Sequence, residues 1–261
     1  RYVGADLRLA AIDMDGTLLD DDKNFPPGME ELLDLMDERG VTFAPASGRQ
    51  VWTLIDMFPG RPGMTVIGEN GGIVMRDGVE VSSSPVDAPT VREVIRLVRD
   101  ATSGPDGIDG GLVMCGKQFA YVERTDDRFV EGVMPYYHRT KRVEDQSAII
   151  DAIEAGEIDD AIVKLAVYVI GPVQALAEAT LARFADTHQY AISGANWADL
   201  QIRGVDKGSA VRDLQRFLGV DRSQTAVFGD AGNDLSMMSE GDLSFAMANA
   251  SRDVVEAARF V

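Results

Sequence analysis

Short apolar runs alternate with amphipathic stretches over the first eighty residues. The runs at 7–12, 41–46 and 64–67 are too short for helices and are typical of strands buried on both faces. An apolar stripe at helical spacing begins after two prolines and ends at Gly40, which predicts a helix between the first two strands. This order predicts a parallel sheet covered by helices.

The pattern changes at residues 82–89, where small polar residues and two prolines suggest a linker. Beyond it, a hairpin around Gly116 and further strands and helices have no α/β alternation. The strand–helix alternation returns near residue 195. We therefore expect an α/β fold: a Rossmann-like, doubly wound parallel sheet core made of residues 1–83 and 195–261, interrupted by an inserted α+β cap domain at 84–194.

Composition and charge narrow the classes of partner. The chain has 261 residues, 45% hydrophobic and 26% charged, so it can bury a core. A formal net charge of -18 argues against nucleic acid and against an anionic membrane surface. A single cysteine, Cys115, allows no intramolecular disulfide. With no apolar run of about 20 residues and no signal peptide pattern, we expect a cytoplasmic protein, monomeric or weakly dimeric.

Acidic and hydroxyl residues follow several of the predicted strands. Asp13, Ser47 and Asp230 each follow a short apolar strand. The carboxyl ends of parallel strands meet at one edge of the sheet. A carboxylate at the end of a buried strand can attack a phosphoryl group. Asp15 follows two residues later, and Gly16 suggests a turn that lets Asp15 act as a general acid and then as a base.

The string Asp-x-Asp-Gly also begins calcium-binding loops. Such a loop needs its glycine at the sixth position and a glutamate at the twelfth. Here Gly16 is at the fourth position from Asp13, and Asn24 is at the twelfth. We therefore exclude a calcium loop of this kind.

Four motifs in order resemble those of the haloacid dehalogenase superfamily of phosphatases. They are DMDGTLL at 13–19 after a strand, Ser47-Gly48-Arg49 after the next, Lys207-Gly208 at the start of a helix, and GDAGND at 229–234 after a later strand. Glu69-Asn70-Gly71, the tail at 245–250 and the position of the insert are similar to the Cof-type subfamily with a C2-type α+β cap. Chains of that subfamily usually continue through a further short segment, so an end at Val261 puts the edge of the sheet in question.

The resemblance implies a role for each motif residue. Asp13 would be the nucleophile and, with Asp230 and the carbonyl of Asp15, a Mg²⁺ ligand. Asp15 would be the general acid and base, and Asp234 would hold metal-bound water or Lys207. The residues expected to bind the phosphoryl group are Thr17, Ser47, Gly48, Lys207 and Asn233, and those expected to contact substrate are Arg49 and Asn70.

Simpler interpretations exist for most of these residues. Asp230, Asp234, Asn233, Ser47 and Thr17 are typical of helix caps, Asn70-Gly71 is a turn signal, and a lone lysine or arginine is usually at the surface. In the insert, the candidates for substrate contact are Lys117, Arg124, His138 and Lys164, but we prefer to interpret them as ordinary surface residues. We interpret Cys115 as a small buried side chain.

The combined pattern predicts a Mg²⁺-dependent phosphomonoester hydrolase that acts on a small phosphorylated metabolite, such as a sugar phosphate, through an aspartyl-phosphate on Asp13. Two alternatives remain open: a phosphotransferase or phosphomutase on the same scaffold, and a non-catalytic protein that binds phosphometabolites. Haloalkanoate dehalogenation is disfavoured because it needs no magnesium and would leave Asp15 without a role.

Overall fold

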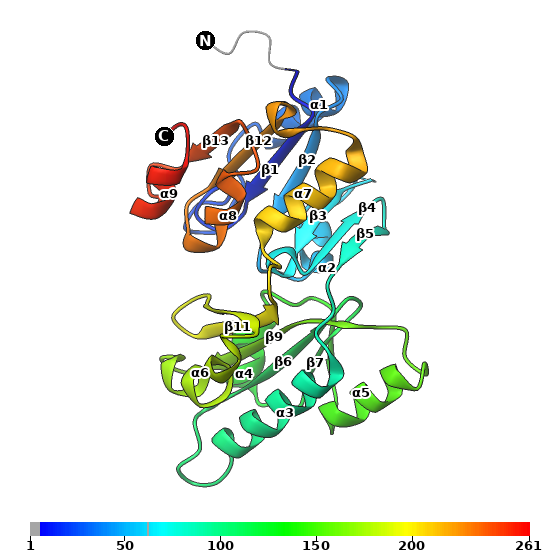
Figure 1. Ribbon diagram of the computed structural model, residues 1–261, viewed down its shortest axis with the longest axis vertical. Coiled ribbons are helices and arrows are strands. Elements are labelled where there is room, and N and C mark those ends of the chain that lie inside the picture. The colour runs from blue at the N-terminus through cyan, green and yellow to red at the C-terminus, as the bar shows by residue number, and fades with distance from the viewer. Residues whose placement is uncertain (1–5, 62) are drawn as a thin grey trace. The chain divides into compact units, whose positions relative to one another are not determined.

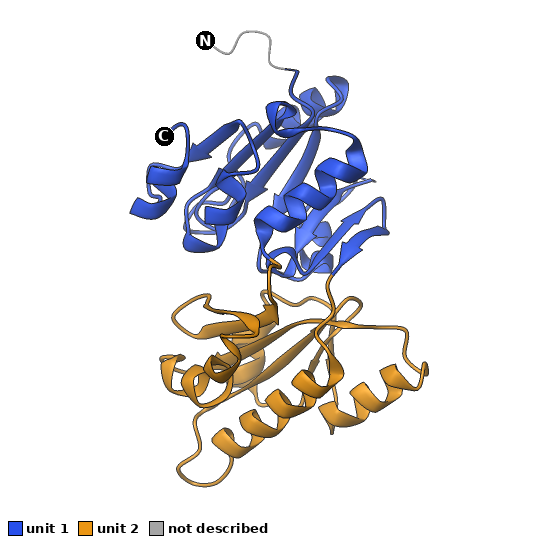
Figure 2. Cartoon of the chain, in the orientation of Figure 1, with its two compact units in different colours: residues 1–83, 206–261 blue, residues 84–205 orange. Residues whose placement is uncertain are grey.

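The computed structural model describes residues 6–61 and 63–261 and divides the chain into two compact units (Figures 1 and 2). The first unit, blue in Figure 2, joins the chain up to Ser83 with Asp206–Val261. The second, orange, is Ser84–Val205. Each unit has its own sheet and its own apolar core.

The first unit is built on a seven-stranded sheet with the order β13-β12-β1-β2-β3-β4-β5. The five strands from β13 to β3 are parallel, and β4 and β5 are antiparallel to their neighbours. The strands are β1 (Leu9–Asp13), β2 (Thr42–Ala46), β3 (Thr65–Gly68), β4 (Ile73–Arg76), β5 (Val79–Ser83), β12 (Thr225–Gly229) and β13 (Leu243–Ala246).

Parallel pairing brings the carboxyl ends of the central strands to one edge. Asp13 at the end of β1 pairs in register with Ala46 at the end of β2, and Ile12 pairs with Phe228 near the end of β12. The side chains that follow these three strands therefore emerge side by side.

Helices cover both faces of this sheet, as expected for a doubly wound fold. Leu9 and Ala11 of β1 share one core with α7, α8 and α9. On the opposite face α1 and α2 pack against β2 and β3, and the rings of Phe43 and Phe58 lie 5.4 Å apart. These helices are α1 (Met29–Glu38), α2 (Val51–Asp56), α7 (Lys207–Leu218), α8 (Leu235–Met238) and α9 (Arg252–Ala257).

The hairpin of β4 and β5 was not predicted from the sequence. The expected linker at 82–89 overlaps the end of β5, which continues to Ser83. Asp77 and Gly78 connect the two strands with φ values of 54° and 74°. Two consecutive left-handed residues are the geometry of a tight hairpin turn, for which Asp-Gly is a favoured pair.

The second unit is an α+β structure on a six-stranded sheet with the order β10-β11-β9-β6-β7-β8. Helices α3, α5 and α6 share a core with one face of the sheet, and α4 packs on the other face with Cys115. The elements are α3 (Ala88–Thr102), β6 (Gly110–Gly116), β7 (Ala120–Val122), α4 (Asp127–Val133), β8 (Thr140–Arg142), α5 (Gln146–Glu154), β9 (Ile162–Val169), α6 (Gln174–Thr180), β10 (His188–Ile192) and β11 (Trp197–Ile202).

The return to the first unit lies later in the chain than the sequence indicated. We expected the core to resume at residue 195, but β11 belongs to the second unit because it pairs with both β9 and β10. The first unit resumes at Asp206. The other expected boundary, between 83 and 84, coincides with the division of the units, while residues 1–5 lie outside the described part of the chain.

The C-terminal residues add to the edge of the first sheet. Phe260 forms a parallel bridge with Phe245 of β13, and Ala246 N donates to Phe260 O at 2.8 Å. The rings of Phe228, Phe245 and Phe260 stack in sequence, with centroids 4.8 Å and 5.0 Å apart. The edge that the sequence put in question is therefore covered by residues of this chain.

None of the described helices is long and apolar enough to cross a membrane.

Two chain segments approach closely just before the start of α7. Gly71 follows β3 with a φ of +95°, and a Cβ at this position would lie 2.2 Å from Asp206 O. Asp206 is the N-cap of α7: its side chain accepts from Ser209 N at 2.8 Å, and Ser209 Oγ accepts from Asp206 N at 3.0 Å. The absence of a side chain at Gly71 thus allows the main chain of Asp206, the N-cap of α7, to pack closely against it.

We expect Gly71→Ala to lower the free energy of unfolding by about 3 kcal/mol, since it adds a clash with main chain to the cost of a left-handed alanine. Gly78→Ala is the matched control, because Gly78 also has a positive φ (+74°) but no atom within 4 Å of an added Cβ. It should cost only about 1 kcal/mol. Urea denaturation of both variants measures the difference, and equal losses would contradict the proposed contact.

Candidate active site

Lys207 is the centre of a buried cluster of charges in the first unit. It is the first residue of α7, and its side chain is completely buried. Its Nζ donates to Asp13 Oδ1 at 2.5 Å and to Asp234 Oδ1 at 2.7 Å. The lysine therefore joins the end of β1 to the loop after β12. Unlike most lysines, it does not lie at the surface.

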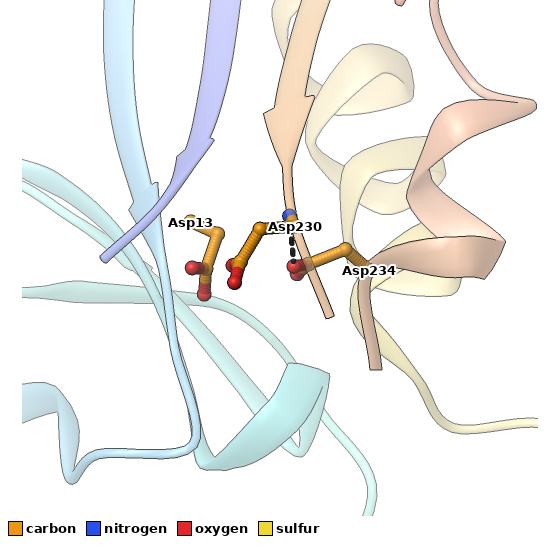
Figure 3. A group of neighbouring side chains, drawn as sticks. All are labelled: Asp13, Asp230 and Asp234. Atoms are coloured by element: carbon orange, nitrogen blue, oxygen red, sulfur yellow. Dashed lines mark hydrogen bonds between the residues drawn. The ribbon is translucent and has the colours of Figure 1, made fainter. Parts of the chain in front are cut away.

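Three carboxylates converge at this site, as Figure 3 shows. Asp13, Asp230 and Asp234 each offer an oxygen, and these oxygens all lie within 4.8 Å of one another. Asp234 is fully buried, and its Oδ2 accepts from Asp230 N at 3.0 Å and Ala231 N at 3.1 Å. Asp234 thus holds the loop that carries Asp230, while Asp13 and Asp230 point toward a shared space (Figure 3).

The residues present fit a hard divalent cation. Asp13 Oδ2 is buried and accepts no hydrogen bond from any described residue. A buried carboxylate oxygen without a donor is unfavourable unless a cation or another donor satisfies it. Mg²⁺ prefers oxygen ligands and keeps several waters, so Asp13 and Asp230 with a main-chain carbonyl provide a suitable donor set.

The electrostatics of the cluster follow from its burial. Desolvation, together with the charge of the neighbouring Asp234, raises the pKa of Asp13 to about 6 against the attraction of Lys207. Burial also raises the pKa of Asp230. For Lys207, burial alone would lower the pKa, but the charges of Asp13 and Asp234 outweigh it and raise the pKa above its usual value. Lys207 is therefore cationic at neutral pH.

Asp15 lies in the turn after β1 and is held by two cations. Arg49 contacts it with two nitrogens: Nη2 is 2.7 Å from Oδ1, and Nε is 3.0 Å from Oδ2. Lys23 Nζ lies 2.9 Å from Oδ1. Burial opposes the ionisation of Asp15, but hydrogen bonds and charges from Arg49 and then Lys23 lower its pKa below the usual value. The structure thus places Arg49, only 7% exposed, in the candidate site.

The expected phosphoryl-binding residues occupy the same edge of the sheet. Thr17 Oγ1 donates to Asp230 Oδ1 at 3.1 Å, so its hydroxyl contacts a carboxylate. Ser47 follows β2, is 3% exposed and accepts from Arg49 N at 3.2 Å. Ser47 does not cap α2, whose N-cap is Gln50.

Asn70 and Asn233 are brought together from distant parts of the sequence. Asn233 Nδ2 donates to Asn70 Oδ1 at 3.2 Å. Asn70 has a φ of 51°, and a Cβ on Gly48 would lie 3.2 Å from the same Asn70 oxygen. Asn70 therefore serves the turn that its Asn-Gly pair predicts and also joins the segments of Gly48 and Asn233.

The sequence reasoning missed two side chains that contact the site. Lys23 gives no local signal, because its neighbours are ordinary polar loop residues. Asn249 donates from Nδ2 to Gly16 O at 2.9 Å. Asn249 could have been found by the rule that identified Ser47 and Asp230, since it lies in the polar segment after the next parallel strand, β13.

The residues singled out in the insert have different surroundings. Arg124 forms ion pairs with Asp109 and Asp126. Lys164 is only 1% exposed, so its interpretation as a surface residue is wrong, and its Nζ lies 5.6 Å from the centroid of the Tyr137 ring. Cys115 is fully buried, as predicted.

The raised pKa of Asp13 makes a prediction about stability in the absence of metal. The folded state holds the Asp13 proton more tightly than the unfolded chain, with a pKa of about 6 against 3.8. This stabilisation is complete below about pH 4 and is lost as the pH rises through about 6. Asp13→Asn removes the titration. In EDTA, the free energy of unfolding of the variant relative to that of the unsubstituted protein should therefore rise by about 1–3 kcal/mol between these pH values.

Urea unfolding at pH 4 and pH 7 measures this difference. A difference between the two proteins that stays constant with pH would contradict the raised pKa.

Comparison with known proteins agrees with this geometry. The sequence model of the haloacid dehalogenase-like hydrolase family matches residues 10–261 of this chain. The chain is 32% identical to the 5-amino-6-(5-phospho-D-ribitylamino)uracil phosphatase YbjI of Escherichia coli, over 97% of this chain and 90% of that protein. It is 26% identical to a phosphoglycolate phosphatase of Methanoculleus marisnigri, over 98% and 90% of the two chains.

A solved structure shows the same fold. A haloacid dehalogenase-like hydrolase of B. subtilis superposes with a TM-score of 0.80 at 20% identity, covering 98% of this chain and 94% of the other. The expected doubly wound core with an inserted α+β domain is thereby confirmed. The chain belongs to the haloacid dehalogenase-like hydrolases and is a phosphatase of the Cof type.

Proposed function

We propose that the protein is a Mg²⁺-dependent phosphomonoester hydrolase that forms an aspartyl-phosphate on Asp13. The observation that carries the proposal is the arrangement of the Asp13 carboxylate: Oδ1 is fixed by Lys207, and Oδ2 is buried at the edge of the sheet and accepts no hydrogen bond from the residues that the structure describes. A carboxylate oriented in this way can hold a cation through one oxygen and attack phosphorus with the other.

The first half-reaction transfers the phosphoryl group to Asp13. The Lys207 ammonium group would reduce the repulsion between this carboxylate and the incoming phosphate dianion, and the Ser47 hydroxyl would donate to a phosphoryl oxygen. Asp15 would give a proton to the leaving oxygen. Because Arg49 and Lys23 favour the ionised form of Asp15, we infer that their contacts to it loosen when substrate binds.

The second half-reaction is hydrolysis of the aspartyl-phosphate. Asp15 would then be ionised, which is the form that Arg49 and Lys23 favour, and it would take a proton from the attacking water. Mg²⁺ would be held by Asp13, Asp230 and the main-chain carbonyl of Asp15, and when bound it neutralises charge on the phosphoryl oxygens. Both carboxylate oxygens of Asp234 already accept hydrogen bonds, from Lys207 and from two main-chain amides. Asp234 would therefore position Lys207 and the loop of Asp230 and would not be a metal ligand.

The substrate class rests on the relatives. One is a phosphatase for 5-amino-6-(5-phospho-D-ribitylamino)uracil and another for phosphoglycolate. These two names support a small phosphorylated metabolite and no single compound. We further propose that the protein acts in the cytoplasm, because its single cysteine is buried and makes no disulfide, which suits a reducing compartment. We also propose that it is a monomer or weak homodimer.

The proposal predicts that the protein releases inorganic phosphate from members of a panel of small phosphate monoesters, that EDTA stops the release, and that added Mg²⁺ restores it. Asp13→Asn should abolish turnover because the amide cannot form the acyl phosphate. Asp253→Asn, an equivalent change on the exposed face of α9, is the control and should leave turnover intact.

The same assay separates the alternatives. Strong dependence on a bisphosphate activator with little phosphate released would indicate a phosphomutase. Tight binding of metabolites without turnover would indicate a binding protein. Full activity in Asp13→Asn would overturn the mechanism.

Asp15→Asn tests the two roles given to that residue. With p-nitrophenyl phosphate, whose leaving group needs no proton, the variant should show a burst of p-nitrophenol equal to the enzyme concentration, followed by turnover slowed by about 10²–10⁴-fold. With an alkyl phosphate, rapid mixing should show no burst. Unchanged turnover of both substrates would remove Asp15 from the chemistry.

A further inference from the structure

The turn after β13 is attached to the residue that follows β12. Met247 N donates to Gly229 O at 3.1 Å, and Ser251 N donates to Asp230 O at 2.8 Å. The turn is closed by Ala250 N, which donates to Met247 O at 2.9 Å. Two main-chain hydrogen bonds therefore attach the turn to Gly229 and Asp230, and a third closes it, which sets the position of the Asn249 main chain relative to Asp230.

The Asn249 amide connects this turn to two other parts of the site. Its Nδ2 donates to Gly16 O at 2.9 Å and lies 3.4 Å from Asp230 Oδ2. Gly16 belongs to the turn after the nucleophile, and Asp230 is a proposed metal ligand. One amide group thus links three segments that are far apart in the sequence.

The Asp230 carboxylate is enclosed by the same turn after β1. Thr17 Oγ1 donates to Oδ1 at 3.1 Å. A Cβ on Gly16, which has a φ of +91°, would lie 2.6 Å from Oδ2. The carboxylate therefore has a donor at one oxygen and close-packed main chain at the other, and Asn249 lies beside this second oxygen.

We propose that Asn249 is a positioning residue for metal binding, which holds the Asp230 carboxylate, and through Gly16 the turn that carries the Asp15 carbonyl, in the orientation that the cation requires. The inference rests on the proposed Mg²⁺ role of Asp230. Hydrogen-bond donors behind a ligating carboxylate orient the ligand, and their loss typically weakens metal affinity by about 10–100-fold. Because the side-chain hydrogen bonds of Asn249 within the described part of the chain go to Gly16 and Asp230 and not to Asp13, its effect is on the metal and reaches the reaction only through it.

The test compares Asn249→Ala with the unsubstituted protein by calorimetric titration of the metal-free protein with Mg²⁺. We expect the dissociation constant for Mg²⁺ to rise by about 10-fold. Ser251→Ala is the matched control: Ser251 lies in the same segment, is exposed, and its side chain makes no capping hydrogen bond. The control should bind Mg²⁺ as the unsubstituted protein does.

Phosphatase assays over a range of Mg²⁺ concentrations give a second measurement. Asn249→Ala should need about 10-fold more Mg²⁺ for half-maximal activity, and activity lost at low Mg²⁺ should return as the concentration is raised. Equal Mg²⁺ affinity of the variant and the unsubstituted protein would overturn the inference, as would a loss of activity that Mg²⁺ does not restore.

Two further observations keep the test decisive. Asn249 is exposed, so the fold should survive the substitution; if Asn249→Ala proves unstable, Asn249→Ser, which retains a short donor, should bind Mg²⁺ with intermediate affinity. Failure of the unsubstituted protein to bind Mg²⁺ would be a failure of the proposed function. Tight binding by the unsubstituted protein and the variant alike would be a failure of the role of Asn249 alone.

Discussion

The buried contact of Lys207 with Asp13 and Asp234 is the interaction on which the candidate site depends. Removing an ammonium and two carboxylates from water is costly, and the cost is offset only when each charge has well-placed partners. Here Lys207 contacts both carboxylates, and main-chain amides hold the second oxygen of Asp234, so the group connects the start of α7, the end of β1 and the loop after β12. The contact therefore determines both the position of the nucleophile and that of the loop that carries Asp230.

The same contact explains how a protein with a net charge of -18 can receive a phosphate dianion. At the edge where β1, β2 and β12 end, the cations Lys207, Arg49 and Lys23 offset most of the negative charge of Asp13, Asp15, Asp230 and Asp234, so this edge is much closer to neutral than the chain as a whole. A fixed cation in a buried site acts through a lower dielectric than surface charges, which water and salt screen. Local placement thus outweighs the overall charge.

The convergence of Asp13, Ser47 and Asp230 could be predicted from the sequence, because parallel register places the ends of their strands at one edge. The motif order then identified Lys207 as a member of the site. The ion pair of Arg49 with Asp15 could not be predicted, since the partner of a long side chain depends on how two loops fold over each other. Similarly, β11 was assigned to the wrong unit, because only its pairing with β9 and β10 shows where it belongs.

The place of the insertion has a consequence for how the two units combine. The first unit is left at the end of β5 and re-entered at the start of α7, and these two elements contact each other within that unit. In terms of topology, the second unit is a long loop between two neighbouring elements of the first. Residues 84–205 could be exchanged for a domain of another shape, or for a short connection, without altering the strand order of the sheet. Such an exchange leaves Asp13, Lys207 and Asp230 on the retained segments, so the scaffold allows the chemistry and the insert to vary independently.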